Sequence, residues 1–270
     1  MDSNRLNLIY KLNHIVNKSD FGTVDYELAK FFLEHFKTIQ NLNIFDIAEK
    51  NHVSRATVRR FSKQLGYSNF SDMKNHAKDF DDGVNLYEEF YGHRNFIPTL
   101  VTNIENLMKE LSVRFNTQEI KRLVEMMNDT KEIIIITSSN IAGLVKTFQQ
   151  QMIVFGKRVT LLTSKKDLNF YKRVEDKPLI IVFSITGLFV SSVMYELNTI
   201  DAKKVLFTID RNPIYNQYFD KIYHLCSQGF SEVNELLYYT YGINFVLDLL
   251  FNEFLFELKK KNIKNKKEGT

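Results

Sequence analysis

The sequence predicts two folds in one chain: an all-α helix-turn-helix domain, followed by an α/β domain with a doubly wound, parallel five-stranded sheet flanked by helices. Up to about residue 80, apolar residues recur every three or four positions, which is typical of amphipathic helices. From residue 96 onward, short β-branched runs alternate with helical patterns, as in parallel sheets buried on both faces. We therefore expect domains at residues 1–80 and 96–270, joined by a linker at 81–95.

Residues 43–70 predict the helix-turn-helix itself. Their apolar positions keep helical spacing and break once, at Asn51–His52, so two short helices joined by a tight turn are expected. Ser54 is a suitable N-cap for the second helix, which would begin at Arg55. Four apolar residues of that helix are expected to face the core: Ala56, Val58, Phe61 and Leu65.

Other helices are expected to brace this pair. An apolar stripe from Leu6 to Val16 predicts a first helix, and Thr23 would cap a second helix that buries its phenylalanines up to Phe36. A short helix through Met73 would close the domain.

The second helix of the pair has an uncompensated positive face, because no Asp or Glu occurs from Lys50 to Ser71. Such a face suits a phosphate backbone, although a solvated amphipathic helix packed on its neighbour would show the same charge. The turn spacing together with the basic face favours double-stranded DNA. Arg55, Thr57 and Arg59 are expected at base edges. Phosphate contacts are expected from Ser54, Arg60 and Lys63, with internal stabilisation of the domain as the alternative for Arg60.

The same residues resemble a known family. The run V-S-R-A-T-V-R-R-F-S-K-Q-L-G-Y is similar to the N-terminal domain of RpiR-type transcriptional regulators. The resemblance implies a recognition helix at about Ser54 to Leu65 and a regulator of carbohydrate metabolism genes. The positions that match the family's pattern are Val53, Ser54, Ala56, Thr57, Arg60, Phe61, Leu65, Gly66 and Phe70.

The second domain is predicted from its strands. Helical patterns at 96–115 and 117–127 precede the first strand, and a long apolar helix is expected from Ser231 to about Leu258. The expected strands are Glu132–Thr137, Arg158–Leu162, Leu179–Ser184, Lys204–Ile209 and Ile222–Leu225.

Two loops of this sheet are candidate ligand sites, because ligands bind beyond the carboxyl ends of parallel strands, near helix N-termini. One loop follows the first strand and the other follows the third. Hydroxyl, amide and glycine residues in them could bind an anion, but the same residue types are also ordinary turn and cap residues. The candidate ligand-binding residues are Ser138, Ser139, Asn140, Ser184, Thr186 and Gly187.

Residues 132 to about 228 resemble a sugar isomerase (SIS) domain, the domain that follows the helix-turn-helix in RpiR-type regulators. The match is best at L-I-I-V-F-S-I-T-G, K-V-L-F-T-I-D and 219–222. It implies a phosphosugar ligand, dimerisation, and phosphate contacts from Ser184 and Thr186. Two features depart from the family: the first loop has no glycine before Gly143, and Phe189 replaces a hydroxyl residue.

Three functions follow from these observations. The first is a DNA-binding regulator, a homodimer or higher homo-oligomer, that senses a phosphosugar. The second keeps DNA binding but uses the sheet domain only as a dimerisation scaffold, as the departures suggest. The third is a sugar-phosphate isomerase, which needs a general base; near the loops only Glu196 and His224 could approach, so we expect no enzyme and no catalytic residue.

The amino-acid composition excludes several other classes of protein. One cysteine, Cys226, excludes an intrachain disulfide and reads as a core thiol in a short strand, and the 6 scattered histidines give no metal motif. No cofactor, metal or membrane segment is expected, and a reducing cytoplasm fits. The net charge of +4 is modest, and the basic tail at 259–270 is expected to be a frayed terminus that could aid DNA binding non-specifically.

Overall fold

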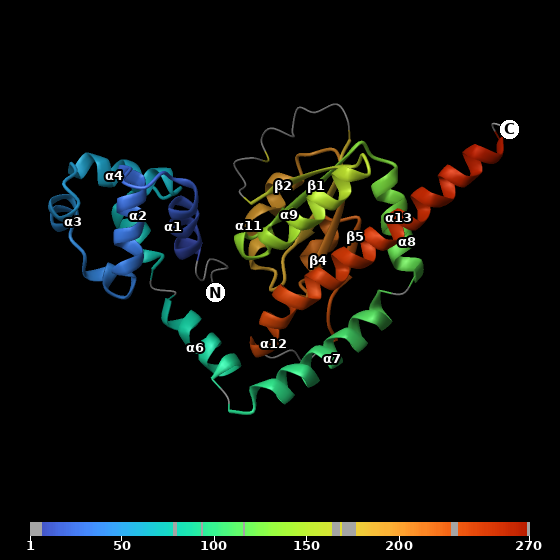
Figure 1. The fold of residues 1–270 in the computed structure, drawn as a ribbon, viewed down its shortest axis with the longest axis horizontal. Helices are drawn as coiled ribbons and strands as arrows, with labels where there is room; N and C mark the ends of the chain where they lie inside the picture. The colour runs from blue at the N-terminus through green and yellow to red at the C-terminus, as the bar shows by residue number, and fades with distance from the viewer. Residues whose placement is uncertain are drawn as a thin grey trace. The chain divides into compact units, whose positions relative to one another are not determined.

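The computed structural model describes residues 7–77, 80–92, 94–115, 117–163, 168, 177–227 and 232–268. The chain divides into two compact units, and the division lies at residues 93–94. The sequence predicts a linker at residues 81–95, and the helix α6, Phe80–Tyr91, occupies the first part of this segment (Figure 1). The predicted domain bounds remain a proposal.

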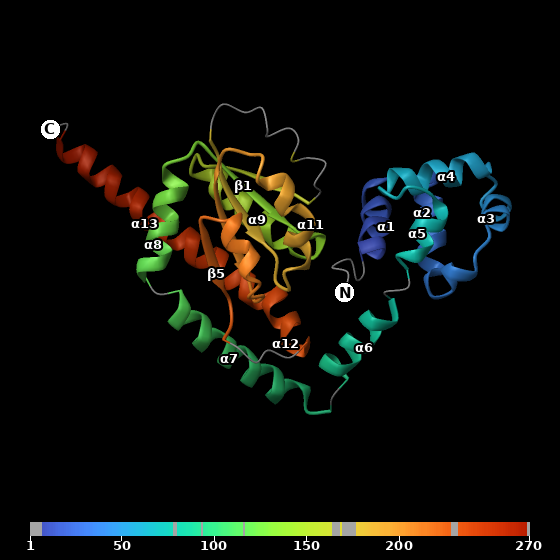
Figure 2. The same cartoon turned by 180° about the vertical axis from the view of Figure 1, so that it is seen from behind.

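In the residues described, the N-terminal unit consists of helices joined by turns and contains no strand (Figure 2). Its core forms because each amphipathic helix contributes an apolar stripe, and the buried Phe32 ring stacks on Phe61 with centroids 5.8 Å apart. Besides α6, its elements are α1 Asn7–Lys18, α2 Val24–Glu34, the 3₁₀ helix η1 Phe36–Asn41, α3 Ile44–Lys50, α4 Arg55–Gln64 and α5 Phe70–Asn75.

The start of α2 is as predicted, but its end is not. The Thr23 hydroxyl accepts the Tyr26 N–H, so Thr23 is the N-cap. The helix was expected to continue through Phe36, whereas His35, at φ −105° and ψ 18°, ends it and Phe36 begins η1. Phe36 is still buried, because the 3₁₀ turn keeps its ring against the core.

The C-terminal unit contains a five-stranded sheet in the order β2-β1-β3-β4-β5, and every pairing is parallel. This confirms the predicted fold class. The two central strands, β1 and β3, are almost fully buried, as expected for strands covered on both faces. The strands are β1 Glu132–Thr137, β2 Arg158–Leu162, β3 Leu179–Phe183, β4 Lys203–Thr208 and β5 Lys221–His224.

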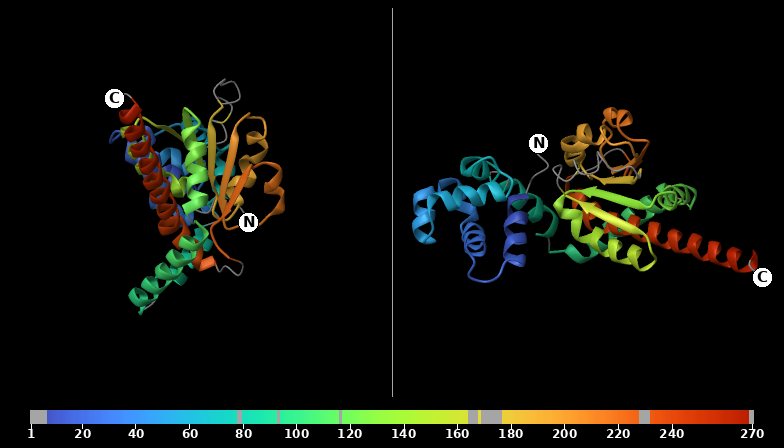
Figure 3. Two further views of the ribbon diagram at one scale, coloured as in Figure 1. Left: turned by 90° about the vertical axis from the view of Figure 1, so that its right-hand side faces the viewer. Right: turned by 90° about the horizontal axis from the view of Figure 1, so that it is seen from above.

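Helices cover both faces of the sheet (Figure 3). One face of the sheet, which includes Ile134 and Val182, packs on α11. Helix α9 lies on the other face. There α13 packs against both α8 and α9. The helices of the unit are α7 Phe96–Arg114, α8 Thr117–Asn128, α9 Ser139–Val154, α11 Leu188–Leu197, η2 Pro213–Gln217, α12 Glu232–Leu237 and α13 Ile243–Glu268.

The C-terminal segment differs from the expectation in two ways. The long helix is interrupted by a π-helical turn, η3 Tyr238–Gly242, before α13 begins. The basic tail was expected to fray from residue 259, but α13 remains helical through Glu268. Lys residues are good helix formers, so the helix can continue without a tertiary contact at every turn. Cys226 is buried as expected, but it follows β5 instead of lying in the strand.

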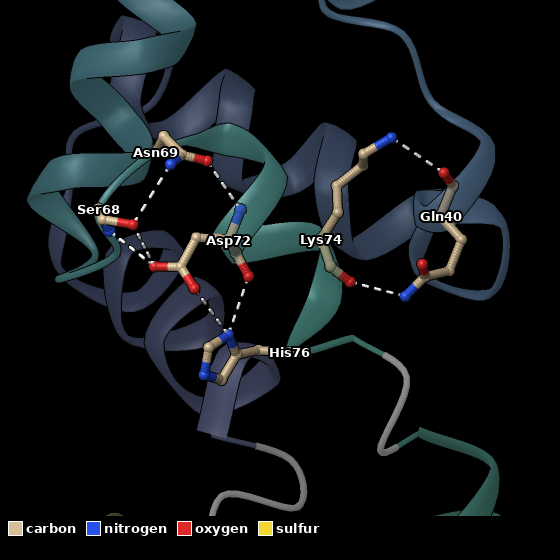
Figure 4. A network of polar contacts seen from close by, with 6 residues as sticks. All are labelled: Gln40, Ser68, Asn69, Asp72, Lys74 and His76. Atoms are coloured by element: carbon tan, nitrogen blue, oxygen red, sulfur yellow. Dashed lines mark hydrogen bonds and ion pairs between the residues drawn. The ribbon is translucent and has the colours of Figure 1, made fainter.

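A hydrogen-bond network orders the segment after α4 (Figure 4). Asn69 caps α5 by accepting the Asp72 N–H at 2.9 Å. Asp72 Oδ2 in turn accepts the backbone N–H and the hydroxyl of Ser68, both at 2.8 Å. These two bonds lower the pKa of the Asp72 carboxyl, because they stabilise its charged form.

No helix in the described part of the chain is both long enough and apolar enough to span a membrane.

Candidate nucleic-acid interface and ligand loops

Two N-caps and a tight turn position the helix pair α3–α4. Asn43 Oδ1 accepts the Phe45 N–H at 2.9 Å, and Ser54 Oγ accepts the Thr57 N–H at 3.1 Å. The Val53 N–H donates to the Ala48 carbonyl at 2.9 Å, so the chain turns directly from α3 towards α4. The predicted turn, the cap at Ser54 and the helix start at Arg55 are all present.

His52 takes an unusual conformation in this turn, with φ of +52°. Left-handed backbone is costly for a residue with a Cβ, although His tolerates it better than most. The turn is therefore set by the hydrogen bonds and core contacts on either side of it.

Further hydrogen bonds connect the elements around α4. Lys74 Nζ, on α5, donates to the carbonyls of Gln40 and Leu42, each at 3.0 Å, and Gln40 Nε2 donates to the Lys74 carbonyl at 2.6 Å (Figure 4). At the C-terminal end of α4, Gln64 Nε2 donates to Asp25 Oδ2 at 2.9 Å. Helix α4 is thus tied to α2 at its C-terminal end, and α5 is tied to the segment before α3.

The face of α4 that points to solvent is strongly basic. Arg55, Arg59 and Lys63 follow one another at four-residue intervals, so they lie in one row along the helix. These three residues and Arg60 are exposed, and none of them forms an ion pair within the described residues. Their charge is therefore available to an external anion.

The remaining two predicted DNA-binding residues are partly engaged within the protein. Ser54 is exposed and Thr57 is half-buried, and their hydroxyl oxygens lie 2.9 Å apart. Each hydroxyl can still accept or donate a further hydrogen bond.

One residue of α4 differs from its expected orientation. Ala56 was expected to face the core but is exposed, whereas Ser62 is fully buried and donates its hydroxyl to the Val58 carbonyl at 3.2 Å. Ala56 therefore belongs to the solvent face, next to Arg60 four residues later. An exposed Ala on a recognition helix can contact the methyl group of thymine.

The two predicted ligand loops lie side by side. Thr137 at the end of β1 is in register with Phe183 at the end of β3, and the Thr137 hydroxyl donates to the Phe183 carbonyl at 3.0 Å. The chain leaves β1 towards β2 on one side of the sheet and leaves β3 towards β4 on the other side. This is a topological switch point, the usual ligand position in open α/β sheets.

The loop after β3 is held by its own hydrogen bonds. Ser184 is only 2 % exposed, and its Oγ accepts the Val190 N–H at 3.0 Å. The Gly187 N–H donates to the Ser184 carbonyl at 3.2 Å. Of the candidate residues in this loop, Thr186 is half-buried and retains access to solvent.

Gly187 is required by the packing beside this loop. Its φ is +79°, and an added Cβ would overlap Oδ2 of Asp210 and Oη of Tyr215. Tyr215 Oη donates to Asp210 Oδ2 at 2.6 Å and lies 3.3 Å from the Gly187 carbonyl. Burial, and then the bond to Asp210, raise the pKa of the Tyr215 phenol, so it stays protonated as a donor.

The departures from the SIS pattern are visible in the structure. Phe189 is half-buried and packs against the hydrophobic core that α11 forms with the sheet. In the loop after β1, Ser138 is the N-cap of α9 but makes no side-chain cap bond. Ser138 and Ser139 are half-buried and Asn140 is exposed, so their side chains remain accessible.

His224, considered as a base in the isomerase alternative, ends the edge strand β5. Its Nδ1 is shielded from solvent and has no hydrogen-bond partner among the residues that the structure describes. Burial, with a smaller effect of Arg211, lowers its pKa. Within the described residues, no group of three or more His, Cys, Asp or Glu side chains could hold a metal ion.

Comparison with known proteins identifies the first unit. Residues 4–81 match the model of the helix-turn-helix domain of the rpiR family. The first unit therefore contains a helix-turn-helix domain of the rpiR type. The HTH-type transcriptional regulator GlvR of Bacillus subtilis is 24 % identical over 183 residues, which are 66 % of this chain and 67 % of GlvR.

Solved structures have a similar fold. The sugar isomerase domain of an RpiR transcription factor from Sphaerobacter thermophilus aligns over 65 % of this chain and 98 % of that one, with a TM-score of 0.49 and 16 % identity. The NanR protein of Vibrio vulnificus, solved in complex with ManNAc-6P, aligns over 97 % of both chains with a TM-score of 0.52 and 16 % identity. The likeness to NanR confirms the fold expected from the sequence.

Proposed function

We propose that this regulator binds an operator in double-stranded DNA through α4, as a homodimer or higher homo-oligomer, and that its SIS-type unit binds a phosphosugar effector. The observation that supports DNA binding most strongly is the row of exposed cations on a capped helix, none of which forms an ion pair within the described residues. This row matches a phosphate backbone in sign, and the helix-turn-helix geometry places such a helix in the major groove.

The residues of α4 divide by position. The first residues of a recognition helix reach base edges, so we assign that role to Arg55, Thr57 and Arg59. Ser54, at the helix N-terminus, and Lys63, one turn beyond Arg59, are assigned to phosphates. Arg60, which is exposed and forms no ion pair within the described residues, is assigned to phosphate as well.

The proposed homodimer or higher homo-oligomer is supported by the number of base pairs that a recognition helix can read. One recognition helix reads only a few base pairs, and two helices spaced by a whole helical turn multiply the discrimination. The proposal includes a cytoplasmic location and the absence of catalysis, in keeping with the relative GlvR, which is a transcriptional regulator.

The effector site is assigned to the switch point between β1 and β3. Its accessible hydroxyl and amide groups are Thr186, Ser138, Ser139 and Asn140, with Ser184 and Gly187 behind them. NanR, which shares this fold, was solved with ManNAc-6P. A phosphosugar from the same chemical class is the effector we propose, and genes of carbohydrate metabolism are the targets.

A specific observation favours the scaffold as a second candidate. The Ser184 hydroxyl is buried and already accepts the Val190 N–H, and Phe189 occupies core space where a hydroxyl residue was expected. In this case the SIS-type unit pairs subunits and binds no sugar phosphate.

DNA binding is tested by enriching duplexes from a random pool with the wild-type chain, then titrating the enriched duplex against variants. Arg59→Ala should weaken binding by about 1–3 kcal/mol and relax the preference at one base position. Lys30→Ala is the control, because Lys30 lies on α2 and is exposed in the same way. Equal losses for both variants, or no enriched duplex, would contradict the proposal.

Effector binding is tested by thermal shift with hexose, pentose, amino-sugar and N-acetyl-amino-sugar phosphates. A ligand at a hundred times its dissociation constant stabilises by about 2.7 kcal/mol. Thr186→Val should remove the shift, because the half-buried hydroxyl is lost while the shape is kept. Ser192→Ala, on the exposed side of α11, should leave it unchanged. No shift with any sugar phosphate would favour the scaffold.

A further inference from the structure

A large aromatic residue is exposed beside the recognition helix. Phe45, on α3, is 57 % exposed, although burying a phenylalanine is normally favourable. The guanidinium carbon of Arg55 lies over this ring, 4.6 Å from its centroid. The two residues therefore form a cation–π pair on the solvent side of the helix pair.

Both partners are attached to rigid backbone. Phe45 is in the first turn of α3, and its N–H is bonded to the N-cap Asn43 at 2.9 Å. Arg55 is the first residue of α4, directly after the N-cap Ser54. Two capped helix starts thus hold the backbone of Phe45 and the backbone of Arg55 in place, and the contact between the two side chains is made from these positions.

Stacking suits an arginine that must read a base. The guanidinium group is planar, so a ring against its face leaves the N–H groups at its edge free for a bidentate bond. A free arginine side chain loses rotamer entropy when it binds, and a side chain already held in place loses less. We infer that Phe45 is a positioning residue that preorders Arg55 for contact with a base edge, an inference that rests on the proposed DNA binding.

A merely structural role for Phe45 predicts different behaviour. More than half of its surface is in solvent, so its removal should leave the N-terminal unit folded. A ring that contacts DNA directly would act independently of Arg55. The test must therefore separate stability, direct contact and positioning.

The experiment is a double-mutant cycle on the full chain, with the duplex enriched by the wild type as the probe. Phe45→Ala and Phe45→Leu should each weaken binding by about fivefold, the loss expected for ordering one long side chain. Phe45→Tyr, which keeps the ring, should restore wild-type affinity. In the Arg55→Ala background, Phe45→Ala should have no further effect, and both single variants should relax the preference at the same base position.

Phe21→Ala is the matched control, because Phe21 is also an exposed phenylalanine of this unit, 87 % exposed, and packs on Tyr26 instead of an arginine. It should bind like the wild type. Additive losses in the cycle, or full affinity for Phe45→Leu, would overturn the inference while leaving the proposed function intact. Failure of the wild type to enrich any duplex would overturn both.

Discussion

Replacement of Gly187 by alanine tests how tightly the β3–α11 loop is packed. At φ +79° an alanine is strained by about 1–2 kcal/mol, whatever space is available. The added Cβ would also lie 2.8 Å from Cβ of Asp210 and would overlap the Asp210 carboxylate and the Tyr215 hydroxyl. Loss of a hydrogen bond to a charged group adds about 1.5–3 kcal/mol. Gly187→Ala should therefore destabilise the C-terminal unit by about 2.5–5 kcal/mol.

Gly156 provides the matched control. Its φ is +78°, almost the same as that of Gly187, and an added Cβ would have no atom within 4 Å. Gly156→Ala should cost only the conformational strain of about 1–2 kcal/mol. Any gain from the smaller entropy of the unfolded chain applies to both variants and cancels in the comparison.

The assay is chemical denaturation of the full chain, followed by circular dichroism and by calorimetry to separate the two units. The same transition should shift in both variants, and the shift should be larger for Gly187→Ala by about 1.5–3 kcal/mol. Equal shifts would show that Asp210 and Tyr215 move aside at little cost, and would refute the argument from close packing.

Three further predictions concern other parts of the chain. Lys63→Ala should weaken DNA binding evenly across sequences and reduce the salt slope by about 1, as measured by titrations at several salt concentrations; a base-specific loss would contradict the phosphate assignment. Asn69→Ala removes the cap of α5 and should lower the free energy of unfolding of the N-terminal unit by about 0.5–2 kcal/mol in urea titrations, and no change would mean that another group replaces the cap. The pKa of His224 is lowered in the folded protein, so the unfolded state binds more protons than the folded state below about pH 6.5, and the free energy of unfolding should fall there. His224→Gln should reduce this fall. If the variant and the wild type show the same pH dependence between about pH 7.5 and 5.5, His224 is not its source.

The strands could be predicted well because their signal is local. Continuous β-branched runs gave Glu132–Thr137 and Arg158–Leu162 with the bounds that the structure shows. The strand ending at Ser184 was one residue too long, since pairing with the neighbouring strands stops at Phe183. The start of α4 was also predictable, because a cap residue and the first helical turn are adjacent in sequence.

Helical geometry predicts the exposure of Ala56 and the burial of Ser62 on α4. At about 100° per residue, Ala56 lies about 200° from Val58, on the opposite side of the helix, whereas Ser62 lies only about 40° from it. The alanine was expected in the core and no orientation was predicted for the serine, but helical geometry places both. A buried serine is tolerated because its hydroxyl bonds to the Val58 carbonyl.

The ligand loops illustrate what sequence patterns omit. Spacing located both loops at the switch point, but the side chains that pack on them come from elsewhere in the chain, and only tertiary structure brings Asp210 and Tyr215 to Gly187. A glycine there suggested close approach of a ligand, yet the same glycine is explained by a carboxylate and a phenol that occupy the space beside it. The proposed effector binding must therefore depend on the hydroxyl groups that keep access to solvent, which is why a substitution at Thr186 tests sensor against scaffold better than one at Ser184 does.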